Sequence, residues 1–147
     1  MGSARKIRSF LQSDPQLKRM FVQAFFLSGL VKFTLVFLSF RKILNWQGAI
    51  QQESPQGPDP GTETYRRNLQ SAMRLCHLYT PWKTECYTRA LTAKILLKKK
   101  RIPSTVYIGF RKEPNGTYAG HAWLRSYDRI VTGREEMNGY IVHSYYS

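Results

Sequence analysis

The segment PWKTECYTRALTAKILL, residues 81–97, decides the fold, because it predicts a helix that begins beside a cysteine. Pro81 ends the preceding helical structure, since its ring disfavours helical geometry in the residue before it. Thr84 is the predicted N-cap, and Lys94 is expected to face water while the apolar side chains around it face a core. Cys86 then falls in the first turn, where free N–H groups and the helix dipole favour a thiolate.

A second segment, TYAGHAWL at residues 117–124, predicts a strand that carries a histidine. A cysteine at a helix start followed by a histidine on a strand is typical of one large class of thiol enzymes. His121 would accept the thiol proton of Cys86, or the two would form a standing thiolate–imidazolium pair. The backbone N–H of Cys86 would help to hold the oxyanion. Taken singly, each residue is more typical of a packed side chain, and the prediction depends on the pair.

The composition indicates one folded, strongly basic domain. The chain has 147 residues, 42% of them hydrophobic, and a formal net charge of +14. Such a charge suits nucleic acid, anionic lipid or an acidic protein, but no nucleic-acid-binding motif is present, so we expect no nucleic-acid partner. Two cysteines at positions 76 and 86 form neither a disulfide framework nor a metal-binding spacing, which favours a cytoplasmic protein without a metal.

Residues 1–50 predict a basic and apolar helical region. Asp14 is the expected N-cap of its main helix, with a proline at the first helical position. Residues 20–40 are long and apolar enough to cross a bilayer, but Lys32 near the middle would cost about 3 kcal/mol there. We therefore expect a buried or interfacial helix, kinked near Ser28. Basic residues at both ends keep peripheral membrane contact through the 20–40 segment open.

The remaining chain predicts an exposed loop and a catalytic core. Residues 51–61 are rich in proline and glycine and form the predicted loop between regions. Residues 62–147 form the predicted core, beginning with a helix at 62–79 in which Cys76 is buried and His77 half-exposed.

Four strands are expected after the cysteine helix. Alternating polar and apolar residues, separated by turn signals, place them at residues 104–111, 118–125, 129–132 and 140–146. The order of elements predicts an α+β fold with N-terminal helices packed on an antiparallel sheet, the strands following one another as a meander.

Taken together, these motifs resemble the leader peptidase of lasso-peptide biosynthesis, the standalone protease half of the pathway's B protein. The resemblance is strong from Tyr65 to the C-terminus and is carried by WKTEC at 82–86, TRAL at 88–91, Ile102-Pro103 and HAWL at 121–124. It implies a transglutaminase-like, papain-related cysteine protease that cuts the leader from a ribosomally made precursor peptide. A small leader-binding protein and an ATP-dependent macrolactam cyclase would be its partners, and no cofactor is implied.

The resemblance also implies an acid that orients His121, and the sequence leaves its identity open. Asp128 is the predicted third catalytic residue, with Glu135, Glu136, Thr132 or a backbone carbonyl as alternatives. A two-residue turn at 126–127 would place Thr132 opposite His121 and Asp128 about 13 Å along the ladder.

Trp82 and Trp123 are the predicted substrate-binding residues. Trp123 shares a strand face with His121, and it either forms the wall of a pocket or belongs to the core. Two other functions stay open on sequence grounds. One is a non-enzymatic, basic module that binds a membrane or a protein, and the other is a peptide-amide acyltransferase with the same cysteine and histidine.

Overall fold

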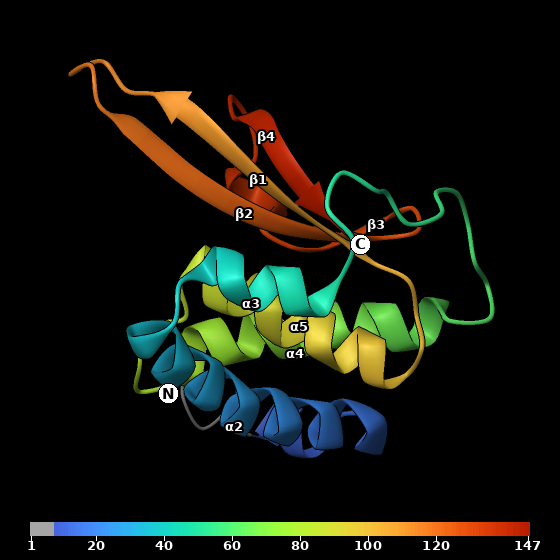
Figure 1. Ribbon diagram of the computed structural model, residues 1–147. Helices are drawn as coiled ribbons and strands as arrows, with labels where there is room; N and C mark the ends of the chain where they lie inside the picture. The colour runs from blue at the N-terminus through green and yellow to red at the C-terminus, as the bar shows by residue number, and fades with distance from the viewer. Residues whose placement is uncertain (1–7) are drawn as a thin grey trace.

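The computed structural model describes residues 8–147 and is an α+β domain, which confirms the predicted class. The first seven residues of the predicted 1–50 region lie outside the described residues, and the division of the chain into three regions stays a prediction. Figure 1 shows the helices on one side of the sheet, with α2 farthest from it. The elements are α2 Pro15–Phe37, α3 Phe40–Gln47, α4 Glu63–Tyr79, α5 Cys86–Lys99, β1 Thr105–Lys112, β2 Tyr118–Ser126, β3 Arg129–Thr132, η1 Arg134–Glu136 and β4 Ile141–Tyr146.

The sheet is antiparallel, but its strands do not form the expected meander. Their order is β3-β2-β1-β4, so β4 lies beside β1 and not beside β3. The reason is the segment after β3, which passes over His121 on its way to the far edge. Gly133 and Tyr140, near the two ends of this segment, both contact the His121 ring.

Helix α5 lies in the centre of the domain, with α2 on one side and the sheet on the other, while α4 lies beside it and contacts both α2 and β3. Because it is covered so completely, Lys94 is buried, and the expectation that it faces water is wrong. Its Nζ donates a hydrogen bond to the carbonyl of Ser104 (3.2 Å). Burial lowers the pKa of Lys94 to about 8.

The start of α5 also differs from the prediction by one residue. Glu85 is the N-cap and makes no side-chain capping bond. Thr84, the expected cap, is buried, and its hydroxyl bonds Nδ1 of His77 on α4 (3.2 Å). Cys86 is therefore the first residue of the helix.

Helix α2 begins as predicted, with the Asp14 side chain accepting a hydrogen bond from the Gln16 N–H (3.1 Å). It continues without a break through Ser28 and Gly29. By length and composition it could cross a membrane. In this structure one stripe of it, including Met20, is buried against α4 and α5.

Candidate active site

Cys86 lies at the start of α5, where its thiol meets strand β2. The backbone N–H groups of Ala122 and Tyr87 lie near enough to the thiol to favour its charged form, and Ala122 is the residue after His121. Burial raises the pKa of the Cys86 thiol, against the lowering effect of these two N–H groups and of Arg89, while Glu136 raises it further. The upward shift favours the neutral form of the thiol. Of the two alternatives from the sequence, this favours transfer of the thiol proton to a base over a standing thiolate.

His121 is buried on β2, and a backbone carbonyl determines its tautomer. Its Nε2 lies 3.0 Å from the carbonyl oxygen of Gly133. A carbonyl oxygen only accepts hydrogen bonds, so Nε2 must carry the proton. In the neutral ring, Nδ1 is then the free base. Trp123 stacks on the same ring with centroids 5.7 Å apart, which fixes the plane of the imidazole.

Gly133 holds this position because no side chain fits there. Its φ is +80°, in the left-handed region that favours glycine. A Cβ at this position would lie 2.7 Å from Cβ of Trp123, 2.9 Å from the carbonyl of Ala122 and 3.1 Å from Nε2 of His121. The close approach of backbone to imidazole therefore depends on glycine.

Glu136 lies at Nδ1 of His121 and links the histidine to helix α5. One carboxylate oxygen is 3.5 Å from Nδ1, and the other is 3.2 Å from a guanidinium nitrogen of Arg89. Arg89 is three residues after Cys86, so the Arg89–Glu136 pair joins the two elements that carry the thiol and the imidazole. Within residues 8–147, no hydrogen bond runs directly from thiol to imidazole, as is common in substrate-free sites. Glu136 is half-exposed, so its side chain has room to move when a substrate enters.

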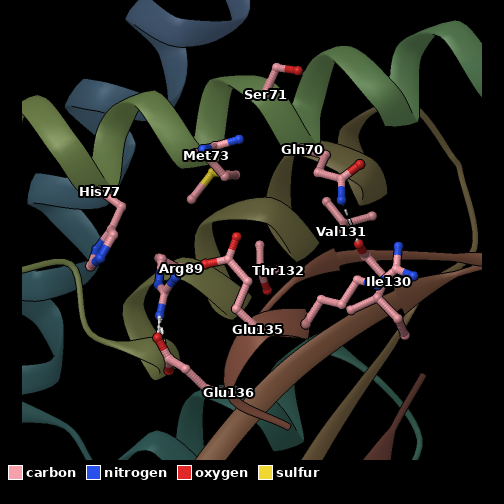
Figure 2. A pocket seen from close by; sticks show the side chains of 13 residues that line it. Gln70, Ser71, Met73, His77, Arg89, Ile130, Val131, Thr132, Glu135 and Glu136 are labelled. Carbon is pink, nitrogen blue, oxygen red and sulfur yellow. Dashed lines mark hydrogen bonds and ion pairs between the residues drawn. The ribbon is translucent and has the colours of Figure 1, made fainter.

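A polar pocket of about 310 Å³ opens beside this pair, between α4 and the β3–η1 segment. Figure 2 shows α4 along one side of the pocket, and the Arg89–Glu136 pair at another. Thr132 Oγ1 and Arg89 Nε are buried here without hydrogen-bond partners. The pocket is therefore suited to a polar group of a ligand.

The structure does not bring Asp128 to His121. The carboxylate binds the guanidinium of Arg66 (2.9 Å), and this hydrogen bond lowers the pKa of Asp128. Asp128 lies beyond the end of β2, whose last residue, Ser126, is five residues from His121, about 16 Å along an extended strand. Arg66 is fully buried and also donates to the carbonyl oxygens of Ser126 and Asp59. Asp128 thus belongs to a structural cluster at the opposite end of the hairpin.

The hairpin register explains the difference from the sequence argument. Ser126 pairs with Arg129, so the turn is at residues 127–128 and not at 126–127. A bulge between Leu124 and Arg125 then shifts the register again, which pairs Leu124 with Thr132. Extended beyond Thr132, this register would place residue 135 opposite His121. However, β3 ends at Thr132 and the chain turns there, which brings the Gly133 carbonyl to the imidazole.

The other candidate acids and Thr132 all lie at the pocket, but they differ in whether they contact His121. Glu135 and Thr132 line the pocket, whereas Glu136 both lines the pocket and contacts the histidine. A backbone carbonyl as the group that orients the imidazole was among the alternatives from the sequence. No signal in the sequence identified Gly133 as its source, since a glycine there only predicted a turn.

The two tryptophans lie away from the pocket. Trp123 is buried, with Tyr107 stacked at 5.7 Å and His121 beside it. Trp82 packs on α2, where its Nε1 donates to the hydroxyl of Ser28 (3.1 Å) and its ring lies 4.9 Å from that of Phe25. Neither residue lines the pocket formed by the described residues. Their places are those of packing residues that support the imidazole and the loop before Cys86.

Among residues 8–147, no group of three or more His, Cys, Asp and Glu side chains is placed to hold a metal ion. A family model described as the transglutaminase-like superfamily matches residues 28–144, well over half of the chain. Among curated proteins and solved structures, none matches the chain significantly.

Proposed function

The chain belongs to the transglutaminase-like superfamily, and from that membership we propose that it is a cysteine peptidase that removes the leader from a ribosomally made precursor peptide. Cys86 is the proposed nucleophile and His121 the proposed base. The family commonly uses cysteine-based catalysis, whereas peptidase activity and lasso-peptide maturation belong to the proposal.

The observation that carries the proposal is the way His121 is held beside the Cys86 end of α5. The Gly133 carbonyl holds the proton on Nε2, which leaves Nδ1 as the basic nitrogen. The Ala122 N–H, adjacent to His121 in the chain, meets the Cys86 thiol. In this proposal, helix α5 carries the thiol and strand β2 carries the base, and the two elements meet where the Ala122 N–H lies near the thiol.

The chemistry follows from these positions. As Glu136 moves aside for the substrate, Nδ1 takes the proton from the thiol, and the sulfur attacks the scissile carbonyl carbon. The N–H groups of Tyr87 and Ala122 stabilise the sulfur as its charge develops. The backbone N–H of Cys86, which has no partner within its helix, can hold the oxyanion. The imidazolium then protonates the leaving amine, and water releases the acyl group by the same steps.

The identity of the substrate rests on the resemblance of residues 65–147 to lasso-peptide leader peptidases. In this proposal, a small leader-binding protein delivers the precursor and an ATP-dependent cyclase closes the macrolactam ring afterwards. The strongly basic surface, with its net charge of +14, is suited to an acidic partner. A cytoplasmic location is part of the same proposal.

Mass spectrometry of a leader–core peptide encoded beside the gene, incubated with this protein and the neighbouring leader-binding protein, tests the function. We expect one cut between leader and core, complete loss of the cut in Cys86→Ala, and activity retained in Cys76→Ala, since Cys76 is buried away from the site. Cleavage that survives Cys86→Ala would refute the proposal.

Two additions to this assay separate the remaining alternatives. Added hydroxylamine or a primary amine would be incorporated into the product if the protein is an acyltransferase, and free carboxylate would predominate if it is a peptidase. Omission of the leader-binding protein should slow cleavage, because that protein raises the effective concentration of the scissile bond. No reaction in any combination would favour a non-enzymatic binding module.

A further inference from the structure

Helix α2 carries an apolar face that none of residues 8–147 covers. Six side chains on this face are half-exposed or more, from 50% to 72%, and three of them are phenylalanines. They extend about 22 Å along the helix at 1.5 Å per residue. Figure 1 shows α2 at the side of the helical layer farthest from the sheet, so this face points away from the rest of the domain. We call it the α2 outer face: Val22, Phe26, Leu30, Phe33, Val36 and Phe37.

The opposite face of α2 is fastened to the domain. Met20, Ala24 and Val31 are buried in the core. Ser28 accepts a hydrogen bond from Trp82, and Lys32 pairs with Glu85 (3.4 Å). The helix therefore cannot turn its outer face inward, and it cannot cross a bilayer without leaving the core that its inner face completes. A helix that is apolar on all sides is normally covered on all sides, so the outer face calls for an external partner.

The charges around the outer face indicate which partner. Lys18 and Arg19 lie in the first turns of α2, and Arg41 and Lys42 follow directly after it in α3. Neither helix contains an Asp or Glu. The acid paired with Lys32, Glu85, belongs to the loop before Cys86 and not to α2 or α3. The outer face is therefore an uncharged apolar surface with cations at both ends, on a chain of net charge +14.

We propose that the α2 outer face docks α2 flat into the interfacial region of a membrane that contains anionic lipid. Such a surface offers acyl chains to the phenylalanines and negative headgroups to the four cations, the two signals that peripheral attachment needs. A second copy of the chain fits less well, because it would bring two surfaces of charge +14 together.

Docking would also place the candidate active site relative to the bilayer. The Trp82 ring lies directly on Gly29 of α2, where a Cβ would be 3.0 Å from it. Trp82 and Glu85, both held by α2, belong to the loop that leads into Cys86. The membrane-bound helix would thus hold the start of α5 at a constant distance from the lipid surface. This inference does not depend on the proposed peptidase activity.

Co-sedimentation of the full chain with vesicles tests the proposal. We expect binding to vesicles of phosphatidylcholine with phosphatidylglycerol, little binding to phosphatidylcholine alone, and release at high salt, because exposed charges are screened. The double variant Phe26→Gln, Phe33→Gln should weaken binding by about tenfold or more, since each of these phenylalanines would bury its ring in the interfacial region of the membrane. The double variant Arg41→Gln, Lys42→Gln should reduce the preference for anionic vesicles, because it removes two of the four cations. Ile141→Gln, a matched change at an exposed position of β4, should leave binding unchanged.

Several outcomes would overturn the proposal. Failure of the wild-type chain to sediment with anionic vesicles would do so, as would an equal effect of Ile141→Gln and the phenylalanine variants. Retention after alkaline carbonate washing would indicate a spanning helix. If the wild-type chain is a dimer in lipid-free solution and the double variant Phe26→Gln, Phe33→Gln is a monomer, this face joins two copies. Circular dichroism of each variant shows that it is folded before the comparison is made.

Discussion

The Gly133 carbonyl does for His121 what an acid does in a triad, although only in part. It holds the proton on Nε2 and orients the ring, with Nε2 and the oxygen 3.0 Å apart. It has no full negative charge with which to stabilise the imidazolium. Glu136, 3.5 Å from Nδ1, is the nearest acid, but it faces the nitrogen that must act as the base. In the proposed mechanism, the site is therefore a Cys86–His121 dyad whose histidine is oriented by a backbone carbonyl.

A substitution at Gly133 should therefore affect catalysis strongly, whereas one at Asp128 should affect it little. Gly133→Ala should lower the cleavage rate by about 100-fold, because a misplaced imidazole is costly to catalysis. Asp128→Asn should remain within a few-fold of wild type. Gly116→Ala is the control for backbone strain, since Gly116 also has positive φ (+86°) but nothing within 4 Å of an added Cβ. Comparison of single-turnover rates checks this, and a large loss in Asp128→Asn would restore the acid to the mechanism.

The Glu136 charge should affect the reactivity of Cys86. Burial is the main cause of the raised pKa of this thiol, and the nearby Glu136 carboxylate adds to it. Glu136→Gln removes a negative charge near the developing thiolate, so the pKa should fall and iodoacetamide labelling should begin at lower pH. Glu135→Gln is the control, because Glu135 is not among the groups that shift this thiol. A shift to higher pH would mean that Glu136 acts mainly by stabilising the imidazolium.

At the scale of elements, α5 combines two tasks with conflicting requirements. Its first residue has to be reachable by a substrate, whereas its later turns fill the centre of the core. Buried side chains are found on all sides of it, and Lys94 is among them with a pKa lowered to about 8. The Ser104 carbonyl satisfies its Nζ, but the charge itself is poorly accommodated.

Lys94 should make the domain more stable in mild alkali. The folded pKa of about 8 lies below the ordinary value of 10.5. Between these pH values the folded chain has lost this proton and the unfolded chain still binds it, so the free energy of unfolding rises with pH. Below pH 8 both states bind the proton and the contribution is constant. Lys94→Met should remove this rise, as measured by urea unfolding at a series of pH values. The same rise in Lys94→Met and wild type would show that other groups cause it.

At the scale of the whole molecule, α2 is part of the same core as the candidate site. Met20 and Ala24 are buried against α4 and α5, and the loop before Cys86 is held by Ser28 and Lys32. The family match likewise begins inside α2, at residue 28. Loss of α2 packing should therefore weaken the entire domain.

Met20→Ala should lower the free energy of unfolding by about 2–5 kcal/mol in a single transition, the range for truncation of a large buried side chain. Val22→Ala, on the exposed face of the same helix, should have a much smaller effect. Denaturant unfolding followed by circular dichroism and by tryptophan fluorescence checks both variants. If α2 were an independent appendage, Met20→Ala would leave the main transition unchanged.

The sequence by itself determined the order of α2, α4, α5 and the four strands, the cysteine at the start of α5 and the histidine on β2, whereas α3 and η1 were not predicted as separate elements. The predicted features follow from periodicity, proline and turn signals, which act over a few neighbouring residues. Asp14 as the cap of α2 was predictable for the same reason, because its hydrogen bond reaches only two residues along the chain.

Only the tertiary structure decided the position of β4, the burial of Lys94 and the group that orients His121. Each depends on contacts between segments far apart in the chain. The hairpin turn lies one residue later than expected and a bulge follows it, and a shift of this size changes which residue lies opposite the histidine. Asp128 is drawn to Arg66, 62 residues away. Gly133 then approaches the imidazole because it alone has no side chain to prevent it.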